Sequence, residues 1–185
     1  NNDGRARVIA GPKALSAEIE AFRLELLSQP ATPEHVLKQV SEMRARIAAA
    51  KVPAGLFDPK LGPGRLQDIE LVAQAASLMA QTAEQSAERS IEGGLAAGVA
   101  IGWLEDADEV ALRRAAGLCA AMVQVLRLLG PDTPMPDEIG AGARALLLRE
   151  TGQQSMSALE TAIDEATAQA ATSITAALAR VPRKP

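Results

Sequence analysis

The chain has 185 residues, of which 48 % are hydrophobic, but it contains no tyrosine, two phenylalanines and one tryptophan. About a fifth of the residues are alanine, the strongest helix former, so the composition favours closely packed helices over a sheet, which prefers aromatic and β-branched residues. The net charge of −4, together with the lack of a basic stripe with interleaved aromatic residues, argues against nucleic acid as a partner.

Helical periodicity begins near the N-terminus. The first apolar series at helical spacing is Leu15, Ile19, Phe22 and Leu26. A second helix is predicted to begin after Thr32, which is a suitable N-cap, with Pro33 at the first helical position. The stripe expected to be buried on this second helix is Val36, Val40, Met43 and Ile47.

A break follows from Lys51 to Gly64, a stretch that contains three prolines and three glycines. These residues predict a non-helical insert near residues 51–65, either a short hairpin or an irregular loop. The break is also the one candidate boundary in the chain. It divides a helical lead-in, residues 1–52, from a bundle, residues 53–185. Beyond it, periodicity predicts a third helix over about residues 66–83 and a fourth over about residues 87–104.

An acidic cluster opens the fifth predicted helix, where carboxylates meet the positive end of the helix dipole. The cluster is Glu105, Asp106, Asp108 and Glu109, and the apolar stripe that follows is Leu112, Ala115, Cys119, Met122, Leu126 and Leu129. Gly130-Pro131 predicts its end. A short helix is expected over about residues 137–149 and a last one after Gly152. The stripe of the last helix is Met156, Leu159, Ile163, Ala166, Ala170, Ile174 and Ala177. The prediction is an all-α bundle of about seven helices.

The usual catalytic constellations are missing from the sequence. One histidine, His35, and one cysteine, Cys119, lie far apart, so neither a Ser-His-Asp motif nor a His/Cys metal cluster can be built from them. We expect His35 to be a surface or capping residue and Cys119 to be a core residue. No P-loop is present. We therefore expect no catalytic and no metal-binding residue in this chain.

Cysteine use and hydropathy indicate a cytoplasmic protein without a membrane partner. A single cysteine excludes an internal disulfide framework and suits a reducing compartment. The longest uncharged apolar run, residues 93–104, is too short to span a bilayer, and no signal peptide is visible.

A Gly-Pro-Gly turn that leads into the third predicted helix is the unusual feature of the chain. Gly62 and Gly64 lie in this turn, and Lys60 and Arg65 flank it. Two interpretations are open. The free N–H groups of the helix start could receive an anion, with the two cations adding charge. Alternatively, the segment is a tight turn with solvated Lys and Arg, and Asp68 simply favours the first helical turn.

Polar residues also form a stripe on the third predicted helix. The stripe is Gln67, Glu70, Gln74 and Gln81, which share one face at helical spacing. Asp68 and Glu70 are two residues apart and so point in different directions, which excludes a side-by-side carboxylate pair. The stripe is either a solvated face or a surface that meets another domain.

The turn and this helix together resemble a motif of the glutamine synthetase adenylyltransferases. In that family a sequence of the form K-x-G-x-G-G-[IL]-x-[DE]-I-E-F-x-x-Q follows each nucleotidyltransferase domain. The matching residues here are Lys60, Gly62, Gly64, Leu66, Asp68, Ile69, Glu70 and Gln74. Arg65 stands where the family has a second glycine, and Leu71 stands where it has phenylalanine.

Flanking segments extend the resemblance over about residues 5–130. Residues 5–11 look like the stretch that leaves the second catalytic domain, and residues 43–47 look like the helix before the motif. The family's later H-R-L-Q sequence is replaced here by residues 122–126, which contain no histidine. The related PII uridylyltransferases have a similar glycine motif, but glutamate at position 70 followed by Gln74 favours the adenylyltransferases.

The resemblance implies a non-catalytic piece of a larger regulatory enzyme. Such a parent transfers AMP from ATP to a tyrosine of glutamine synthetase and uses Mg²⁺ bound in a nucleotidyltransferase domain, whose Gly-Ser and D-x-D signatures are absent here. Residues 1–52 would lead in from that domain. The implied partners are this domain, glutamine synthetase and the PII signal protein. Lys60 and Arg65 would lie near phosphate, and Glu70 and Gln74 would face the catalytic domain. The alternatives are a helical interaction module without chemistry and the equivalent domain of a PII uridylyltransferase.

Overall fold

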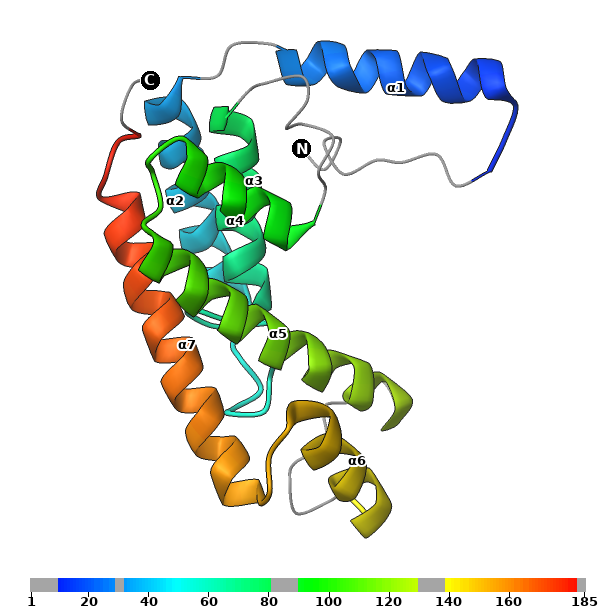
Figure 1. The fold of residues 1–185 in the computed structure, drawn as a ribbon, viewed down its shortest axis with the longest axis vertical. Helices are drawn as coiled ribbons and strands as arrows, with labels where there is room; N and C mark the ends of the chain where they lie inside the picture. The colour runs from blue at the N-terminus through cyan, green and yellow to red at the C-terminus, as the bar shows by residue number, and fades with distance from the viewer. Residues whose placement is uncertain (1–9, 29–31, 81–89, 130–138, 183–185) are drawn as a thin grey trace.

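A computed structural model describes residues 10–28, 32–80, 90–129 and 139–182, and within these ranges it contains seven helices and no strand (Figure 1). The helices are α1 (Lys13–Ser28), α2 (Pro33–Ala50), α3 (Leu66–Ala80), α4 (Ile91–Ala100), α5 (Asp106–Leu129), α6 (Ala141–Thr151) and α7 (Met156–Leu178). The predicted all-α bundle is confirmed. The insert before α3 is an irregular loop rather than a hairpin.

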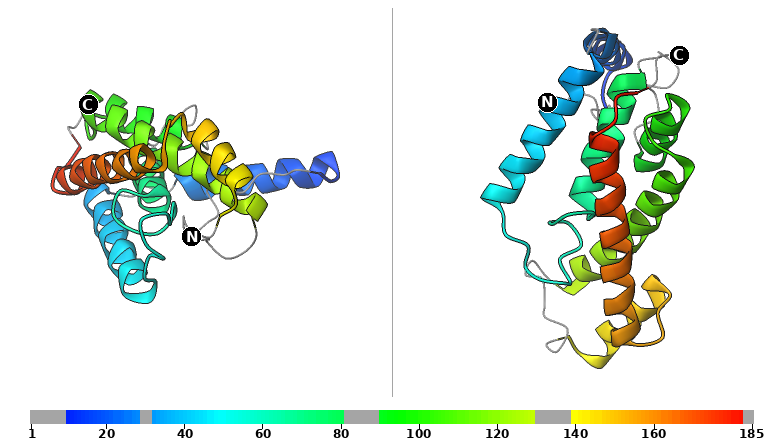
Figure 2. Two further views of the ribbon diagram at one scale, coloured as in Figure 1. Left: turned by 90° about the horizontal axis from the view of Figure 1, so that it is seen from below. Right: turned by 90° about the vertical axis from the view of Figure 1, so that its left-hand side faces the viewer.

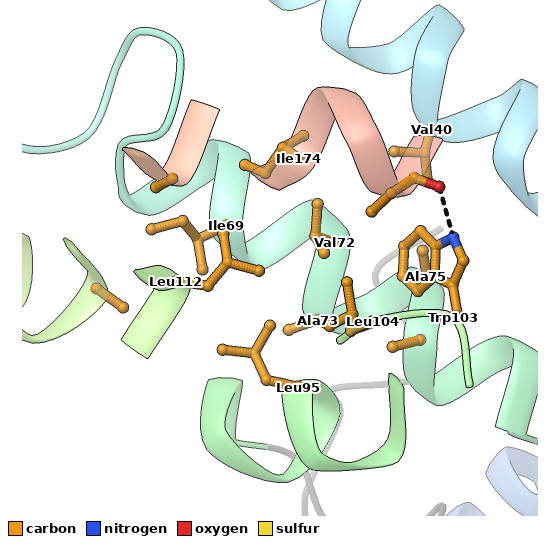
Figure 3. Packing of buried hydrophobic residues seen from close by; sticks show 14 of the residues in the cluster. Val40, Ile69, Val72, Ala73, Ala75, Leu95, Trp103, Leu104, Leu112 and Ile174 are labelled. Atoms are coloured by element: carbon orange, nitrogen blue, oxygen red, sulfur yellow. Dashed lines mark hydrogen bonds between the residues drawn. The ribbon is translucent and has the colours of Figure 1, made fainter. Parts of the chain in front are cut away.

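The first of two apolar clusters joins α2, α3, α4, the first half of α5 and the second half of α7. The Trp103 side chain is fully buried in it, next to Val72, Ala75 and Leu104 (Figure 3). Its ring Nε1 donates a hydrogen bond of 2.8 Å to the carbonyl oxygen of Ala177. This bond ties the turn between α4 and α5 to the C-terminal end of α7.

The second cluster lies at the other end of the bundle, where α6 packs against α5 and α7. Its buried residues are Phe57, Met122, Val125, Ile139, Leu147, Leu159 and Ile163. Figure 2 shows α7 running along the length of the bundle, with α6 beside its first turns. The two long helices α5 and α7 therefore contribute to both clusters, and Phe57 anchors the insert to the second one.

Glycines allow α3 and α4 to pack with their backbones close together. A Cβ at Gly94 would lie 2.4 Å from the carbonyl oxygen of Ala73, and one at Gly98 would lie 2.7 Å from the side chain of Leu104. A side chain at Gly94 would therefore force α3 and α4 apart, whereas one at Gly98 would require the buried side chain of Leu104 to move. The weak helix propensity of this glycine-rich segment is offset by close packing.

The predicted stripe of the first helix is exposed rather than buried. Helix α1 extends away from the bundle in Figure 1 and forms no extensive contact with another helix. Leu15 is 52 % exposed, Ile19 38 % and Phe22 61 %. The side chain of Leu26 lies outside the described residues. Periodicity thus gave the correct helix, but it could not show that the other described helices offer this stripe no packing surface.

The second helix follows the prediction at its start and departs from it at its end. Thr32 is the N-cap, its hydroxyl accepting from the N–H of His35, and Val36, Leu37 and Val40 are buried. Met43 and Ile47 are only partly buried. Helix α2 packs on α3 and contributes to the first cluster. The proposed boundary near residue 52 stays a prediction.

The end of α4 differs from the prediction. The helix ends at Ala100 instead of reaching Leu104, because Gly102 adopts a left-handed conformation with φ +65° and its N–H donates to the carbonyl oxygen of Val99.

The predicted stripes of α5 and α7 are buried, except for partly exposed Leu129 and Met156. Helix α6 runs over 141–151 rather than 137–149, and residues 137 and 138 lie outside the described part. No helix among the described residues is long and apolar enough to cross a membrane.

Candidate functional site

The insert is organised around the buried carboxylate of Asp58. One oxygen, Oδ1, accepts hydrogen bonds from the N–H groups of Lys60 (2.9 Å) and Leu61 (3.0 Å). The other, Oδ2, accepts from the N–H of Ala54 (3.1 Å). Three backbone donors converge on this single side chain, so Asp58 fixes the path of the loop that carries the glycine motif.

Arg65 belongs to the same network. Its Nη1 donates to the carbonyl oxygen of Gly55 at 2.9 Å and to the carbonyl oxygen of Asp58. The guanidinium therefore closes the insert on itself. Arg65 stands where the family motif has its third glycine, and here the larger side chain has a structural role within the loop.

The N–H groups at the start of α3 are used within the chain. The N–H of Leu66 donates to Pro59 (3.2 Å), that of Gln67 to Lys60 (3.1 Å) and that of Arg65 to Gly62 (3.2 Å). These donors cannot also bind an anion without breaking the loop. The segment is a tight turn, although Arg65 bonds to carbonyl groups of the insert instead of being solvated. Anion binding by this segment stays a prediction.

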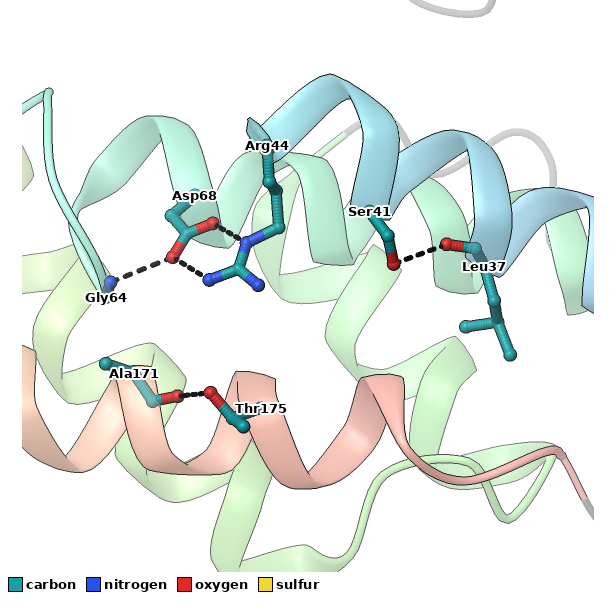
Figure 4. Close-up of polar contacts among 7 residues, drawn as sticks. All are labelled: Leu37, Ser41, Arg44, Gly64, Asp68, Ala171 and Thr175. Atoms are coloured by element: carbon teal, nitrogen blue, oxygen red, sulfur yellow. Dashed lines mark hydrogen bonds and ion pairs between the residues drawn. The ribbon is translucent and has the colours of Figure 1, made fainter. Parts of the chain in front are cut away.

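Asp68 ties three parts of the molecule together (Figure 4). Its Oδ1 accepts from Nε of Arg44 on α2 at 2.5 Å, and its Oδ2 accepts from Nη2 of the same arginine at 3.0 Å. Oδ2 also accepts from the N–H of Gly64 at 2.9 Å. The Asp68 side chain is 9 % exposed and that of Arg44 25 %. This two-point ion pair holds α2, the glycine turn and α3 in one arrangement.

Both glycines of the motif are required by the backbone. Gly62 has φ +122° and Gly64 has φ +69°, conformations that residues with a Cβ rarely adopt. A Cβ at Gly64 would also lie 2.0 Å from the carbonyl oxygen of Thr167 and 2.7 Å from the nitrogen of Ala171, both on α7. The turn therefore touches the backbone of α7 directly.

A half-open pocket lies between the insert, the second half of α2 and the first turns of α3. It is lined by Arg44, Ile47, Ala48, Lys51, Pro53, Lys60, Leu61, Gly62, Pro63, Gln67, Asp68 and Leu71. The structure thus brings Lys60, Gly62 and Asp68 together at one pocket. Arg65, Glu70 and Gln74 are not part of its lining; Glu70 and Gln74 lie further along α3 and are partly buried.

The pKa of Asp58 is set by opposing effects. Burial raises it, but the N–H groups of Leu61, Lys60 and Ala54 and the positive charge of Arg65 outweigh burial, so the pKa lies below the ordinary value of 3.8. The unfolded chain therefore binds a proton on this group more readily than the folded one. The resulting stability is present above about pH 3.8 and is lost as the pH falls through the folded pKa.

We expect Asp58→Asn to lower the free energy of unfolding at neutral pH by about 1 to 2 kcal/mol, because an amide nitrogen cannot accept from a backbone N–H. The difference from wild type should shrink as the pH falls below 3.8. Urea unfolding followed over a pH series measures this. Asp164→Asn, an exposed position on α7, is the control. A loss that stays constant down to acid pH would contradict the assigned role of the Asp58 carboxylate.

The remaining reactive side chains have ordinary surroundings. His35 is exposed and its Nε2 lies 2.8 Å from the amide nitrogen of Gln39, as expected for a surface histidine. Cys119 is buried, as predicted, and burial raises its pKa to about 11, so it stays a neutral thiol. Among the described residues no three His, Cys, Asp or Glu side chains are grouped closely enough to hold a metal ion.

Comparisons with known proteins give a consistent result. The chain is 35 % identical over 162 residues to a protein from Bradyrhizobium sp. strain BTAi1, which covers 87 % of this chain and 16 % of that protein. It is 33 % identical over 177 residues to one from Bradyrhizobium sp. strain ORS 278, which covers 95 % of this chain and 18 % of that protein. A shorter match, 42 % identical over 76 residues, is to a protein of Rhizobium meliloti.

All three relatives are named bifunctional glutamine synthetase adenylyltransferase/adenylyl-removing enzyme. No family model and no solved structure matches the chain. The chain spans about one sixth of the length of the first two relatives. It is therefore a relative of one segment of the bifunctional glutamine synthetase adenylyltransferase/adenylyl-removing enzymes, which confirms the family resemblance of the glycine motif.

Proposed function

We propose that this chain is a non-catalytic helical segment of an enzyme that adenylylates glutamine synthetase in nitrogen regulation. It would follow a nucleotidyltransferase domain, pack on it, and help form the surface that meets nucleotide or protein substrate. The observation that carries the proposal is similarity along 87–95 % of the chain to enzymes named for this reaction.

The geometry of the glycine motif supports a positioning role. Asp68 links Arg44, the turn and α3, and Asp58 with Arg65 fixes the insert. These contacts hold Lys60 at the rim of a pocket, and its side chain is exposed. Such a preformed surface suits contact with a substrate or a neighbouring domain.

ATP and Mg²⁺ belong to the parent enzyme in this proposal. The described part of the chain groups no carboxylates in a way that fits a magnesium ion. As the family resemblance implies, the carboxylates that hold the metal would lie in the preceding nucleotidyltransferase domain. Within the present chain, Lys60 would face nucleotide phosphate, while Glu70 and Gln74 would face that domain.

Transfer of labelled AMP from ATP to purified glutamine synthetase tests the proposal. Three proteins are compared: this chain alone, the chain joined to its natural upstream sequence, and the joined form with Lys60→Ala and Glu70→Ala. We expect only the intact joined form to label its target at full rate. The double variant should lose activity about tenfold or more. Without these two side chains the substrate would be positioned less accurately, and a small misplacement slows the reaction strongly.

The matched control is the joined form with Lys38→Ala and Glu42→Ala, which removes the same two charges from an exposed pair on α2. It should keep full activity, and circular dichroism should show equal folding for all variants. Equal activity of the Lys60/Glu70 variant and the control would contradict the role of the motif. A silent wild-type joined form would contradict the proposed function as a whole.

A second candidate function is a helical interaction module without chemistry. Helix α1 favours it, because Leu15 and Phe22 expose large apolar side chains on one helix, and such surfaces are typical of protein contacts. The upstream reading frame distinguishes the two candidates. A D-x-D nucleotidyltransferase segment before Asn1 supports the enzyme segment, and its absence supports the module.

A further inference from the structure

The pocket beside the glycine motif has an apolar lining from three separate segments. Its apolar residues are Ile47 and Ala48 from α2, Pro53, Leu61 and Pro63 from the insert, and Leu71 from α3. A concave site lined mainly by apolar residues with a few polar groups is the usual form of a small-molecule site. This pocket therefore offers room for the apolar part of a ligand.

The charges around the pocket do not cancel. Asp68 is the one carboxylate in its lining, and it forms an ion pair with Arg44, which also lines the pocket. Lys51 and Lys60 remain, and neither ammonium group bonds to a residue in the described part of the chain. Within the described part of the chain these two lysines have no ion-pair partner, so the pocket has a local excess of positive charge on a chain whose net charge is −4. This local excess favours an anion.

We infer that this pocket binds a small organic anion. A ring or branched apolar group would occupy the surface formed by Ile47, Leu61 and Leu71, and a phosphate or carboxylate would pair with Lys51 and Lys60. The network of Asp58 and the Arg44–Asp68 pair hold the walls in place before a ligand arrives, which lowers the entropic cost of binding.

An NMR titration of the isotope-labelled 185-residue chain tests this inference. The probes are AMP, phenylacetate, adenosine and inorganic phosphate. AMP or phenylacetate, which combine a ring with an anion, should shift the amide resonances of residues 44–51 and 60–71. Either one binding supports the inference and identifies phosphate or carboxylate as the group recognised. Adenosine and phosphate should each bind more weakly than AMP, because adenosine has the ring without the anionic group and phosphate has the anionic group without the ring.

Two matched pairs of variants locate the site. Lys60→Ala should weaken binding of the anionic ligand about five- to tenfold, whereas Lys38→Ala, another exposed lysine on the chain, should not. Ala48→Glu places a carboxylate in the pocket and should abolish binding. Ala45→Glu is the same change at an exposed position of α2 outside the lining and should have no effect.

Three results would overturn the inference: no shifts with AMP or phenylacetate at millimolar concentration, equal binding of inorganic phosphate and AMP, or equal effects of the two members of either pair. Because the pocket borders the glycine motif, this site rests on the proposed function for its biological role. Binding by the chain alone and AMP transfer by the joined protein are separate measurements, so either can fail without the other.

Discussion

Replacing Gly64 by alanine is expected to lower the free energy of unfolding by about 3 kcal/mol or more. Two costs add at this position. The residue has φ +69°, and its new Cβ would lie 2.0 Å from the carbonyl oxygen of Thr167, a backbone atom that cannot rotate away. The glycine turn would have to separate from α7. Urea unfolding of the 185-residue chain measures the loss.

Gly152 provides the matched control for this prediction. It has the same φ of +69°, but nothing lies within 4 Å of an added Cβ. Gly152→Ala should therefore show the conformational cost alone, about 1 kcal/mol. If Gly64→Ala costs no more than Gly152→Ala, the turn does not depend on its contact with α7, and the close approach described here is wrong.

Trp103→Ala is expected to cost about 3 to 5 kcal/mol, because it removes the largest fully buried side chain and leaves a cavity in the first apolar cluster. Trp103→Phe keeps most of the apolar volume and loses the hydrogen bond to Ala177, so it should cost less, about 1 to 2 kcal/mol. Circular dichroism follows unfolding here, since the variants lack the chain's single tryptophan.

An exposed apolar residue of α5 serves as the reference for Trp103. Val110 is 66 % exposed, and Val110→Ala should change the stability by less than about 0.5 kcal/mol. A Trp103→Ala variant as stable as Val110→Ala would show that the α4–α5 turn does not need its anchor on α7. A loss of stability for Trp103→Phe as large as that for Trp103→Ala would assign most of the stabilisation to the hydrogen bond.

The sequence by itself determined the fold class and most helices, because helical periodicity and caps are local signals. Thr32 and Pro33 mark the start of α2, the acidic cluster marks the start of α5, and the apolar stripes of α5 and α7 are buried except at Leu129 and Met156. Local signals also placed the irregular insert correctly. The family resemblance rested on a short motif, Lys60 to Gln74, whose residue types and spacing were visible without any structure.

The tertiary structure decided what each residue of that motif does. Arg44 and Asp58 are not among the predicted site residues, because Arg44 lies 24 residues from its partner Asp68 and Asp58 bonds only to nearby backbone. The sequence could not show that Arg65 bonds to carbonyl groups of the insert, nor that Gly64 touches α7. The Arg44–Asp68 pair and the contact of Gly64 with α7 join segments far apart in the chain, and their partners are chosen by how the helices pack. Periodicity and local propensity carry no information about that packing, which is why the fold was predictable and the pocket was not.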